Sequence, residues 1–151
     1  MTITEKKINR TLQTDLRTVF QLRVSQEELD ALNRCDHNVR YKYVMKRIAD
    51  TETIWTMSKD RSTIAIQIQD GIRLFPIWSS KEYGIAFCED ICPDFSCLPI
   101  SLEDFVEYFI DFICDEDLMI NVFPTVKEPL GKIVDINEFA NQLGKELEEY
   151  K

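Results

Sequence analysis

Apolar residues recur with a period of two in the middle of the chain, and this spacing predicts strands there. Residues 53–58 and 62–69 show the alternation that is typical of strands with one buried face. The Asp-Gly pair at 70–71 favours a tight hairpin turn, because both turn positions need a positive φ. The return strand, residues 72–78, contains Pro76, which predicts that this strand ends there or lies at an edge of the sheet.

Helical spacing dominates much of the remaining chain, and each predicted helix begins at a polar capping residue. After most of these caps, a carboxylic acid stands three residues further on, which is the capping-box pattern. The helix expected after Ser101 carries a wide apolar stripe from Leu102 to Ile113, with Val106 as a member. The predicted caps are Ser25, Asp36 or Asn38, Ser79, Ser101 and Asp135.

These elements predict an α+β fold with a mostly antiparallel sheet of about four strands, packed with four to five helices. The last strand of that sheet is expected at residues 118–123. A chain of 151 residues is long enough for one core, so residues 25–151 are expected to form a single α+β domain. Residues 1–24 are interpreted as an N-terminal extension, which is either helical around Leu12 and Leu16 or an appendage docked on the domain.

Several short motifs, in order along the chain, resemble a known bacterial family. The chain is similar to the domain of unknown function 2750 family in R-Y-K-Y-V-M-K-R-I-A-D-T-E-T-I-W, L-F-P-I-W, P-I-S-L-E-D-F, I-N-V-F-P-T and E-L-E-E-Y. The resemblance extends from about residue 38 to the C-terminus and implies a small bacterial α+β protein. The family has no established activity, so the resemblance assigns no catalytic residues. Its anchors are Arg40, Tyr41, Trp55, Pro76, Trp78, Leu102, Phe105, Phe123, Pro124, Thr125 and Tyr150.

Charge is distributed unevenly along the chain. The net charge is −9, and residues 82–126 contain 11 Asp and Glu but no Lys or Arg. Residues 1–81, by contrast, hold 14 basic and 10 acidic residues. A surface built from the acidic stretch repels nucleic acid phosphates and attracts basic partners.

The acidic residues with the most informative spacing lie on the helix predicted after Ser101. Three of them are four residues apart and line up on one face, where like charges cost a few tenths of a kcal/mol per pair. We therefore predict a partner-binding surface, with two alternatives: a solvated face neutralised by the basic helix 40–47, and a divalent-cation site, which no calcium-loop spacing supports. The predicted partner-binding residues are Glu103, Asp104, Glu107, Asp111 and Asp115.

The cysteine-rich stretch C-E-D-I-C-P-D-F-S-C raises the question of a metal or redox site. Cys88, Cys92 and Cys97 are separated by three and four residues, spacings that a zinc site allows, and its fourth ligand would be Cys114, Cys35, His37 or an acid. Packing as small apolar side chains is favoured, because free cysteines are commonly buried. Cys35 and His37 flank Asp36 and are interpreted as part of a helix cap, because sequence neighbours rarely face each other.

A small-molecule pocket is the alternative to partner binding. Arg40, Tyr41 and Trp78 recur in the motif set, and we expect them to line such a pocket if one exists. Other aromatic residues on the strands, such as Trp55 and Phe75, are more typical of a core. The chain has no glycine-rich phosphate loop, so no nucleotide cofactor is expected, and no other cofactor is indicated.

The sequence favours a cytoplasmic binding protein over an enzyme. It contains no apolar run of membrane-spanning length and no apolar N-terminal signal segment, so neither secretion nor membrane insertion is expected. The function expected is non-catalytic engagement of a basic macromolecule, one version being an immunity or antitoxin role against a cationic toxin. The identity of the partner and the oligomeric state do not follow from the sequence.

Overall fold

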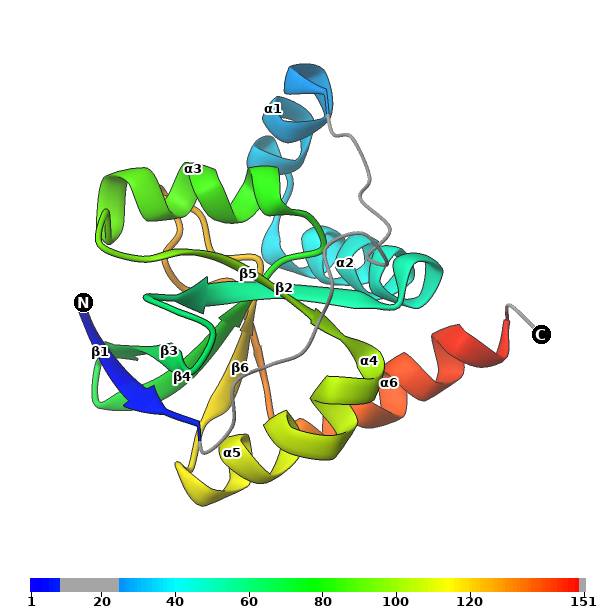
Figure 1. Cartoon of the computed structure of the whole chain (residues 1–151). Helices are drawn as coiled ribbons and strands as arrows, with labels where there is room; N and C mark the ends of the chain where they lie inside the picture. Colours follow the sequence, from blue (N-terminus) through cyan, green and yellow to red (C-terminus); the bar gives the residue numbers. More distant parts are fainter. Residues whose placement is uncertain (9–24, 150–151) are drawn as a thin grey trace.

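A computed structural model of the chain describes residues 1–8 and 25–149. In this part the elements form one sheet with helices on both sides of it (Figure 1). The elements are, in order, β1 (Thr2–Lys7), α1 (Gln26–Arg34), α2 (His37–Thr51), β2 (Thr53–Ser58), β3 (Thr63–Gln69), β4 (Ile72–Ile77), α3 (Lys81–Ile91), β5 (Ser96–Ser101), α4 (Leu102–Asp104), η1 (Phe105–Phe109), α5 (Ile110–Asp115), β6 (Met119–Val122), β7 (Lys132–Val134) and α6 (Ile136–Glu148).

The predicted fold class is confirmed, but the strand number is wrong. Within the described residues the sheet has seven strands in the order β5-β2-β3-β4-β6-β7, with β1 paired to β3. The sheet is mixed, because β4 and β6 run parallel while the other pairs are antiparallel. The helices in residues 1–8 and 25–149 number five if α4, η1 and α5 are counted as one continuous helix over residues 102–115.

The strands that the sequence did not predict are those whose own residues show little strand pattern. β5 contains Pro99 and pairs along its whole length with β2, while β7 is only three residues long. β1 belongs to the predicted N-terminal extension, and its register joins Thr2 to Ile68 of β3. The helix predicted within residues 1–24, around Leu12 and Leu16, lies outside the described residues.

Pro76 does not end β4 or place it at an edge, contrary to the prediction. β4 lies between β3 and β6, and Pro76 pairs with Asn121 in the parallel ladder. Pairing of β4 with β3 stops at Leu74, and Trp78 then bridges to Trp55 of β2. Pro76 has no N–H to donate, and it lies between the residues that pair with β3 and the residue that bridges to β2. The missing hydrogen bond therefore costs little stability.

The turn and cap predictions are confirmed at most positions. Asp70 and Gly71 have φ values of 53° and 78°, as the hairpin requires. Backbone N–H groups donate to the side chains of the caps Ser25, Asp36, Ser101 and Asp135. The prediction at Ser79 is wrong, because α3 begins after Ser80. The Ser80 hydroxyl donates to Glu82 at 2.5 Å instead of capping a backbone N–H.

The helix over residues 102–115 contains a π turn that the apolar pattern does not predict. Phe105 and Phe109 stack in parallel with ring centroids 6.4 Å apart, and Phe112 joins them in the core. Val106, predicted to be on the apolar stripe, is 65% exposed. The buried face is thus narrower than expected and leaves an apolar residue among the surface acids.

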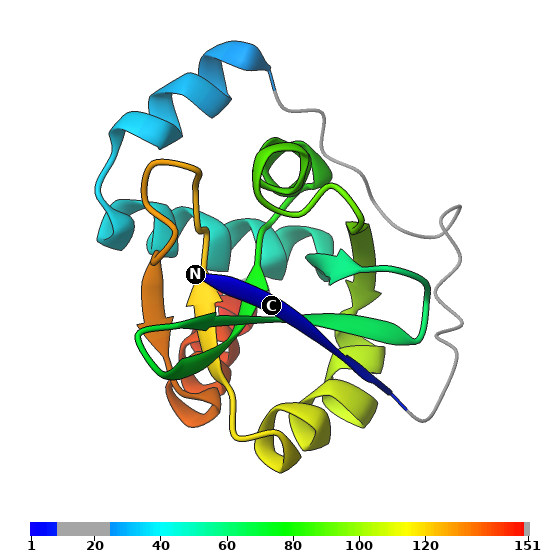
Figure 2. The same ribbon diagram turned by 90° about the vertical axis from the view of Figure 1, so that its left-hand side faces the viewer.

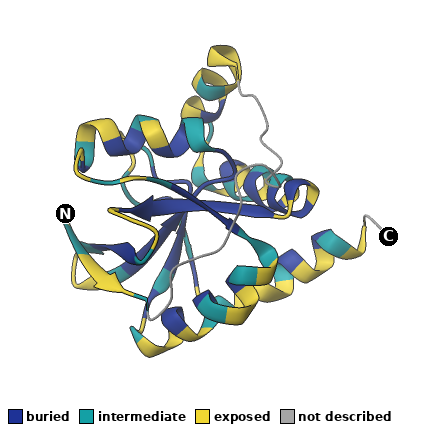
Figure 3. Cartoon of the chain, in the orientation of Figure 1, coloured by how far each residue is buried: buried dark blue, intermediate teal, exposed yellow. Residues whose placement is uncertain are grey.

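The strands form the centre of the core, and most of their residues are buried (Figure 3). In both views α3 lies on one side of the strands, and α4 and α5 lie on the opposite side (Figures 1 and 2). No helix in residues 1–8 and 25–149 is long and apolar enough to cross a membrane.

Candidate functional site

The helix over residues 102–115 carries all five residues of the predicted partner-binding surface. Four are exposed: Glu103, Glu107, Asp111 and Asp115, called here the acidic face. Asp104 is half-buried, its backbone N–H donates to Ser101 Oγ at 3.1 Å, and it takes part in a further interaction. The structure thus brings the predicted acids onto one element and sets Asp104 apart from the exposed four.

The acidic face is not neutralised by cations of the described chain. None of its four carboxylates makes an ion pair with any residue that the structure describes. The neighbouring Glu116 is the acid that finds cations: Arg73 Nη2 lies at 3.2 Å and Lys6 Nζ at 4.0 Å. Arg73 also donates to the Glu116 carbonyl at 3.1 Å, which offsets the negative end of the helix dipole.

The basic helix α2 does not supply the missing counter-charges. Its residue Arg47 pairs with Asp50 of the same helix at 3.6 Å. Arg40 pairs with Glu128 at 2.9 Å, on the loop after β6. Neutralisation of the acidic face by these two arginines is therefore absent from the described structure.

Arg40 is a buried structural cation. Its side chain is 0% exposed, and Nη1 donates to the carbonyls of Leu32 (3.4 Å) and Cys35. Nη2 donates to Glu128, and the guanidinium carbon lies 5.8 Å from the centre of the Phe123 ring. The arginine thereby ties the α1–α2 turn to the loop after β6.

Tyr41 and Trp78, the other residues of the predicted pocket, also face the interior. Trp78 is fully buried and its indole N–H donates to the Pro124 carbonyl at 3.0 Å. Tyr41 is half-buried, and burial together with the charge of Glu138 raises the pKa of its hydroxyl. Neither Arg40 nor Trp78 offers surface to a ligand in this conformation.

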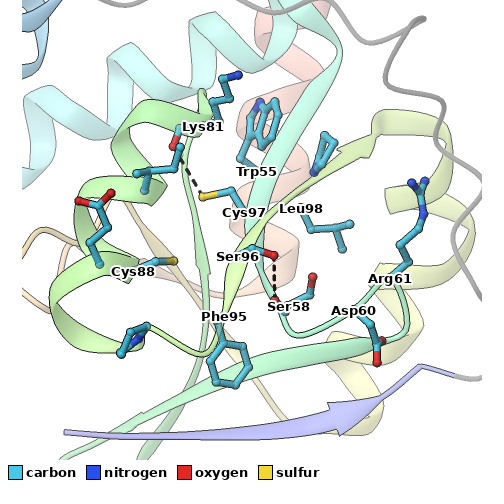
Figure 4. A pocket seen from close by; sticks show the side chains of 14 residues that line it. Trp55, Ser58, Asp60, Arg61, Lys81, Cys88, Phe95, Ser96, Cys97 and Leu98 are labelled. Atoms are coloured by element: carbon cyan, nitrogen blue, oxygen red, sulfur yellow. Dashed lines mark hydrogen bonds between the residues drawn. The ribbon is translucent and has the colours of Figure 1, made fainter.

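A cavity of about 630 Å³ opens instead between α3, β5 and the loop that joins β2 to β3 (Figure 4). Figure 4 shows Lys81 and Trp55 at one side and Phe95 at the opposite side, with Asp60 and Arg61 on the loop. The size is typical of small-molecule sites. Its walls include Trp55, Ser58, Ile85, Phe95, Cys97 and Leu98.

The sequence did not reveal this cavity, because one of its walls is β5, a strand that the pattern missed. Local hydrogen bonds engage several polar groups in the walls. Cys97 Sγ donates to the Lys81 carbonyl at 3.6 Å, and Ser96 Oγ donates to the Ser58 carbonyl at 3.4 Å. The Asp60 carboxylate accepts the backbone N–H groups of Ser62 and Thr63, which lowers its pKa.

The three cysteines of the acidic stretch, Cys88, Cys92 and Cys97, gather beside the cavity. Cys88 and Cys92 are buried, and Cys92 Sγ donates to Met57 Sδ at 3.2 Å. Hydrogen bonding to Cys92 acts to lower the pKa of Cys88, but hydrogen bonding to Cys97 and burial raise it to about 12. The Cys92 pKa is raised by its hydrogen bond to Cys88 and by burial. Protonated thiols are poor nucleophiles, and both residues are buried, which supports a packing role for Cys88 and Cys92.

Other candidate chemistry finds local explanations. Asp36 caps α2 by accepting the N–H groups of Asn38 (2.8 Å) and Val39 (3.1 Å), which lowers its pKa. These contacts of Asp36 confirm the cap interpretation of this segment. The neighbouring Cys35 thiol donates to the Ala31 carbonyl at 3.3 Å. Among residues 1–8 and 25–149, no three His, Cys, Asp or Glu side chains are arranged to hold a metal ion.

Comparison with protein families finds one match. Residues 41–143 match the family described as "Protein of unknown function (DUF2750)", which covers most of the domain and confirms the resemblance seen in the motifs. No curated protein and no solved structure matches the chain.

Proposed function

Because the chain belongs to the DUF2750 family, whose description assigns no activity, we propose a function from its surface: it binds a basic protein through the acidic face, without catalysis. The observation that carries the proposal is the set of four exposed carboxylates on one helix, none of them ion-paired within the described chain. A basic partner would supply the cations that the domain does not.

The arrangement has an energetic cost that a purely structural helix would avoid. Glu103, Glu107 and Asp111 repeat at spacings of four, where like charges destabilise a helix by a few tenths of a kcal/mol per pair. Asp115 stands at the last position of α5, where the helix dipole also disfavours an anion. A neutral side chain at Glu107 or Asp111 would remove the repulsion, and a cation at Asp115 would suit the helix dipole, so the acidity of these positions is better explained by an external partner.

The same face offers an apolar contact. Val106 is 65% exposed and lies between Glu103 and Glu107 in the chain. Protein interfaces commonly combine an apolar centre with a charged rim that is complementary to the partner. Val106 would bury apolar area on docking, while the carboxylates steer the partner and set its orientation.

A cationic toxin is the most concrete form of such a partner, since an immunity or antitoxin role requires rapid capture of a basic protein. Opposite charges raise association rates, and salt screens this effect over a Debye length of about 8 Å at physiological ionic strength. A site at Arg40, Tyr41 and Trp78 is less favoured, because Arg40 and Trp78 are sealed in the core.

Charge reversal with a matched control tests the proposal. A basic protein captured from the source cells at low salt is purified, and its association rate with the full chain is measured by stopped flow. The triple variant Glu103→Lys/Glu107→Lys/Asp111→Lys is expected to slow association at least about tenfold at low salt. The control Glu138→Lys/Glu148→Lys/Glu149→Lys changes the net charge equally on exposed positions of the C-terminal segment.

The two triple variants separate specific docking from general attraction. The acidic-face variant should lose binding to the partner, and its association should lose its dependence on salt. The control variant should retain most of the binding and most of the salt dependence. Equal rates for the two variants would show that only net charge matters and would refute the acidic face as the docking site.

A further inference from the structure

The α3–β5 cavity lies away from the acidic face. α3 packs on one side of the strands, and α4 and α5 lie on the other (Figures 1 and 2). The cavity has a volume of about 630 Å³, within the range of roughly 300–1,000 Å³ that small-molecule sites occupy. Binding here would therefore be a separate property from partner docking.

The walls favour an apolar ligand body. Ile85 of α3 is 39% exposed, and Leu98 of β5 and Phe95 lie across the cavity from α3 (Figure 4). Cys88 and Cys97 contribute thiols, and a protonated thiol packs as a small, polarisable, weakly polar group. Trp55 forms the wall at the end where Lys81 stands.

The ends of the cavity carry opposite charges. Lys81 is the first residue of α3 and Glu89 lies in its last turn, eight residues on and about 12 Å away along the helix. The helix dipole has the same sense, positive at the Lys81 end and negative at the Glu89 end. Among the described residues Lys81 has no ion-pair partner, whereas the Asp60 carboxylate is held by its own loop.

We propose that the α3–β5 cavity binds a small amphipathic monocarboxylate, with its apolar body along Ile85, Leu98 and Phe95 and its carboxylate at Lys81. Arg61, on the opposite wall, adds positive charge to the rim. The exposed Glu89 disfavours a second anionic group at the far end. A monocarboxylate therefore fits better than a dicarboxylate or an amine.

Titration with decanoate tests this, with decylamine and decanol as probes of the same length. Trp55 lines the cavity, and Trp78 lies directly behind it against Gly84, so tryptophan fluorescence reports occupancy. Decanoate is expected to bind saturably and at least about tenfold more tightly than decylamine, because the half-buried Lys81 acts on a bound charge more strongly than the exposed Glu89, where decylamine would have to place its ammonium group. Decanol should lie between the two.

Two variants locate the bound probe. Lys81→Glu should weaken decanoate at least about tenfold and reverse its preference over decylamine. Ile85→Trp places a large side chain in the cavity and should abolish saturable binding of all three probes, which is measured by isothermal titration calorimetry because the added tryptophan changes the fluorescence. The matched controls are Lys132→Glu, on β7, and Val39→Trp, at an exposed valine of α2; both should bind decanoate like the unmodified chain.

Three results would overturn the assignment: no saturable decanoate binding, equal affinities for decanoate and decylamine, or decanoate binding that survives Ile85→Trp. Circular dichroism and urea unfolding of each variant establish that any loss reflects the cavity and not the fold. Because Ile85 is partly exposed and Lys81 is half-buried, both variants are expected to fold.

Discussion

At the residue scale, the clearest lesson comes from Arg40, which the motif set presents as a binding residue and the structure places in the interior. Its guanidinium donates to the backbone carbonyls of Leu32 and Cys35 and to the carboxylate of Glu128, and the Leu32 carbonyl also accepts the Cys35 N–H. A buried charge with several hydrogen bonds costs much more to disrupt than an exposed one.

Replacement of Arg40 tests its structural role. Arg40→Ala is expected to lower the free energy of unfolding by about 3–5 kcal/mol, because it removes a buried, paired cation and leaves the Cys35 carbonyl without the Arg40 donor. Lys42→Ala, an exposed position on the same helix, should change it by less than about 0.5 kcal/mol. Urea denaturation measures both, and similar small effects would show that the Arg40 contacts contribute little.

A pair of tyrosines couples stability to alkaline pH. Tyr83 and Tyr43 place their hydroxyls 3.2 Å apart, and burial, followed by the hydrogen bond to Tyr43, raises the pKa of Tyr83 well above its usual value of about 10. The folded chain therefore keeps a proton that the unfolded chain releases above pH 10. Unfolding free energy should fall as pH rises beyond that point, by at most about 1.4 kcal/mol per pH unit for this group.

Tyr83→Phe removes the titrating group and should flatten this alkaline decline. Chemical denaturation at pH 8 and pH 11 measures how much unfolding free energy each protein loses. For the variant, the loss is taken relative to its own stability at pH 8. If the variant loses as much unfolding free energy at alkaline pH as the unmodified chain, groups other than Tyr83 cause the decline.

At the element scale, the contact between α3 and β5 is close enough to require a glycine. A Cβ added at Gly84 would lie 2.6 Å from Cys97 Sγ and 3.2 Å from the Trp78 ring. Gly144, on α6, has nothing within 4 Å of the same position. The two glycines therefore form a matched pair with opposite expected responses to alanine.

Gly84→Ala is expected to destabilise the chain by about 1–3 kcal/mol through overpacking. Gly144→Ala should stabilise it by about 0.5–1 kcal/mol, because alanine is the better helix former. Adding Cys97→Ala to Gly84→Ala should recover a large part of the loss, as thermal unfolding would show. No coupling between the two positions would mean that α3 and β5 pack less tightly than the structure indicates.

Elements whose own residues carry a cap, turn or periodic pattern could be predicted from the sequence. Elements that depend on pairing with another strand could not. Caps such as Ser25 and Asp135 and the 70–71 turn depend on residues close in sequence, and the structure has them as predicted. β5 owes its strand geometry to β2, which lies far back in the chain, and β7 has only three residues to pair with the neighbouring β6, so their sequences alone do not reveal them. The cavity was missed for the same reason, while the acidic face was found because one helix carries it.

At the scale of the whole molecule, the two proposed sites occupy opposite sides of the strands (Figures 1 and 2). The chain has a net charge of −9 and pairs some of its acids internally, such as Glu116 and Glu128. The acidic face has no such pairs among the described residues, so negative potential is expected to be strongest over the helix at 102–115. This helix is the surface that we propose a basic partner covers.

Hydrogen–deuterium exchange of the chain, alone and bound to its purified basic partner, examines that claim most directly. Backbone amides become protected where an interface excludes water or suppresses local opening. Added protection is expected to concentrate in residues 102–117 and to be absent from α3 and β5. Protection concentrated on α3, on β5 or on any other face, with residues 102–117 unchanged, would contradict it.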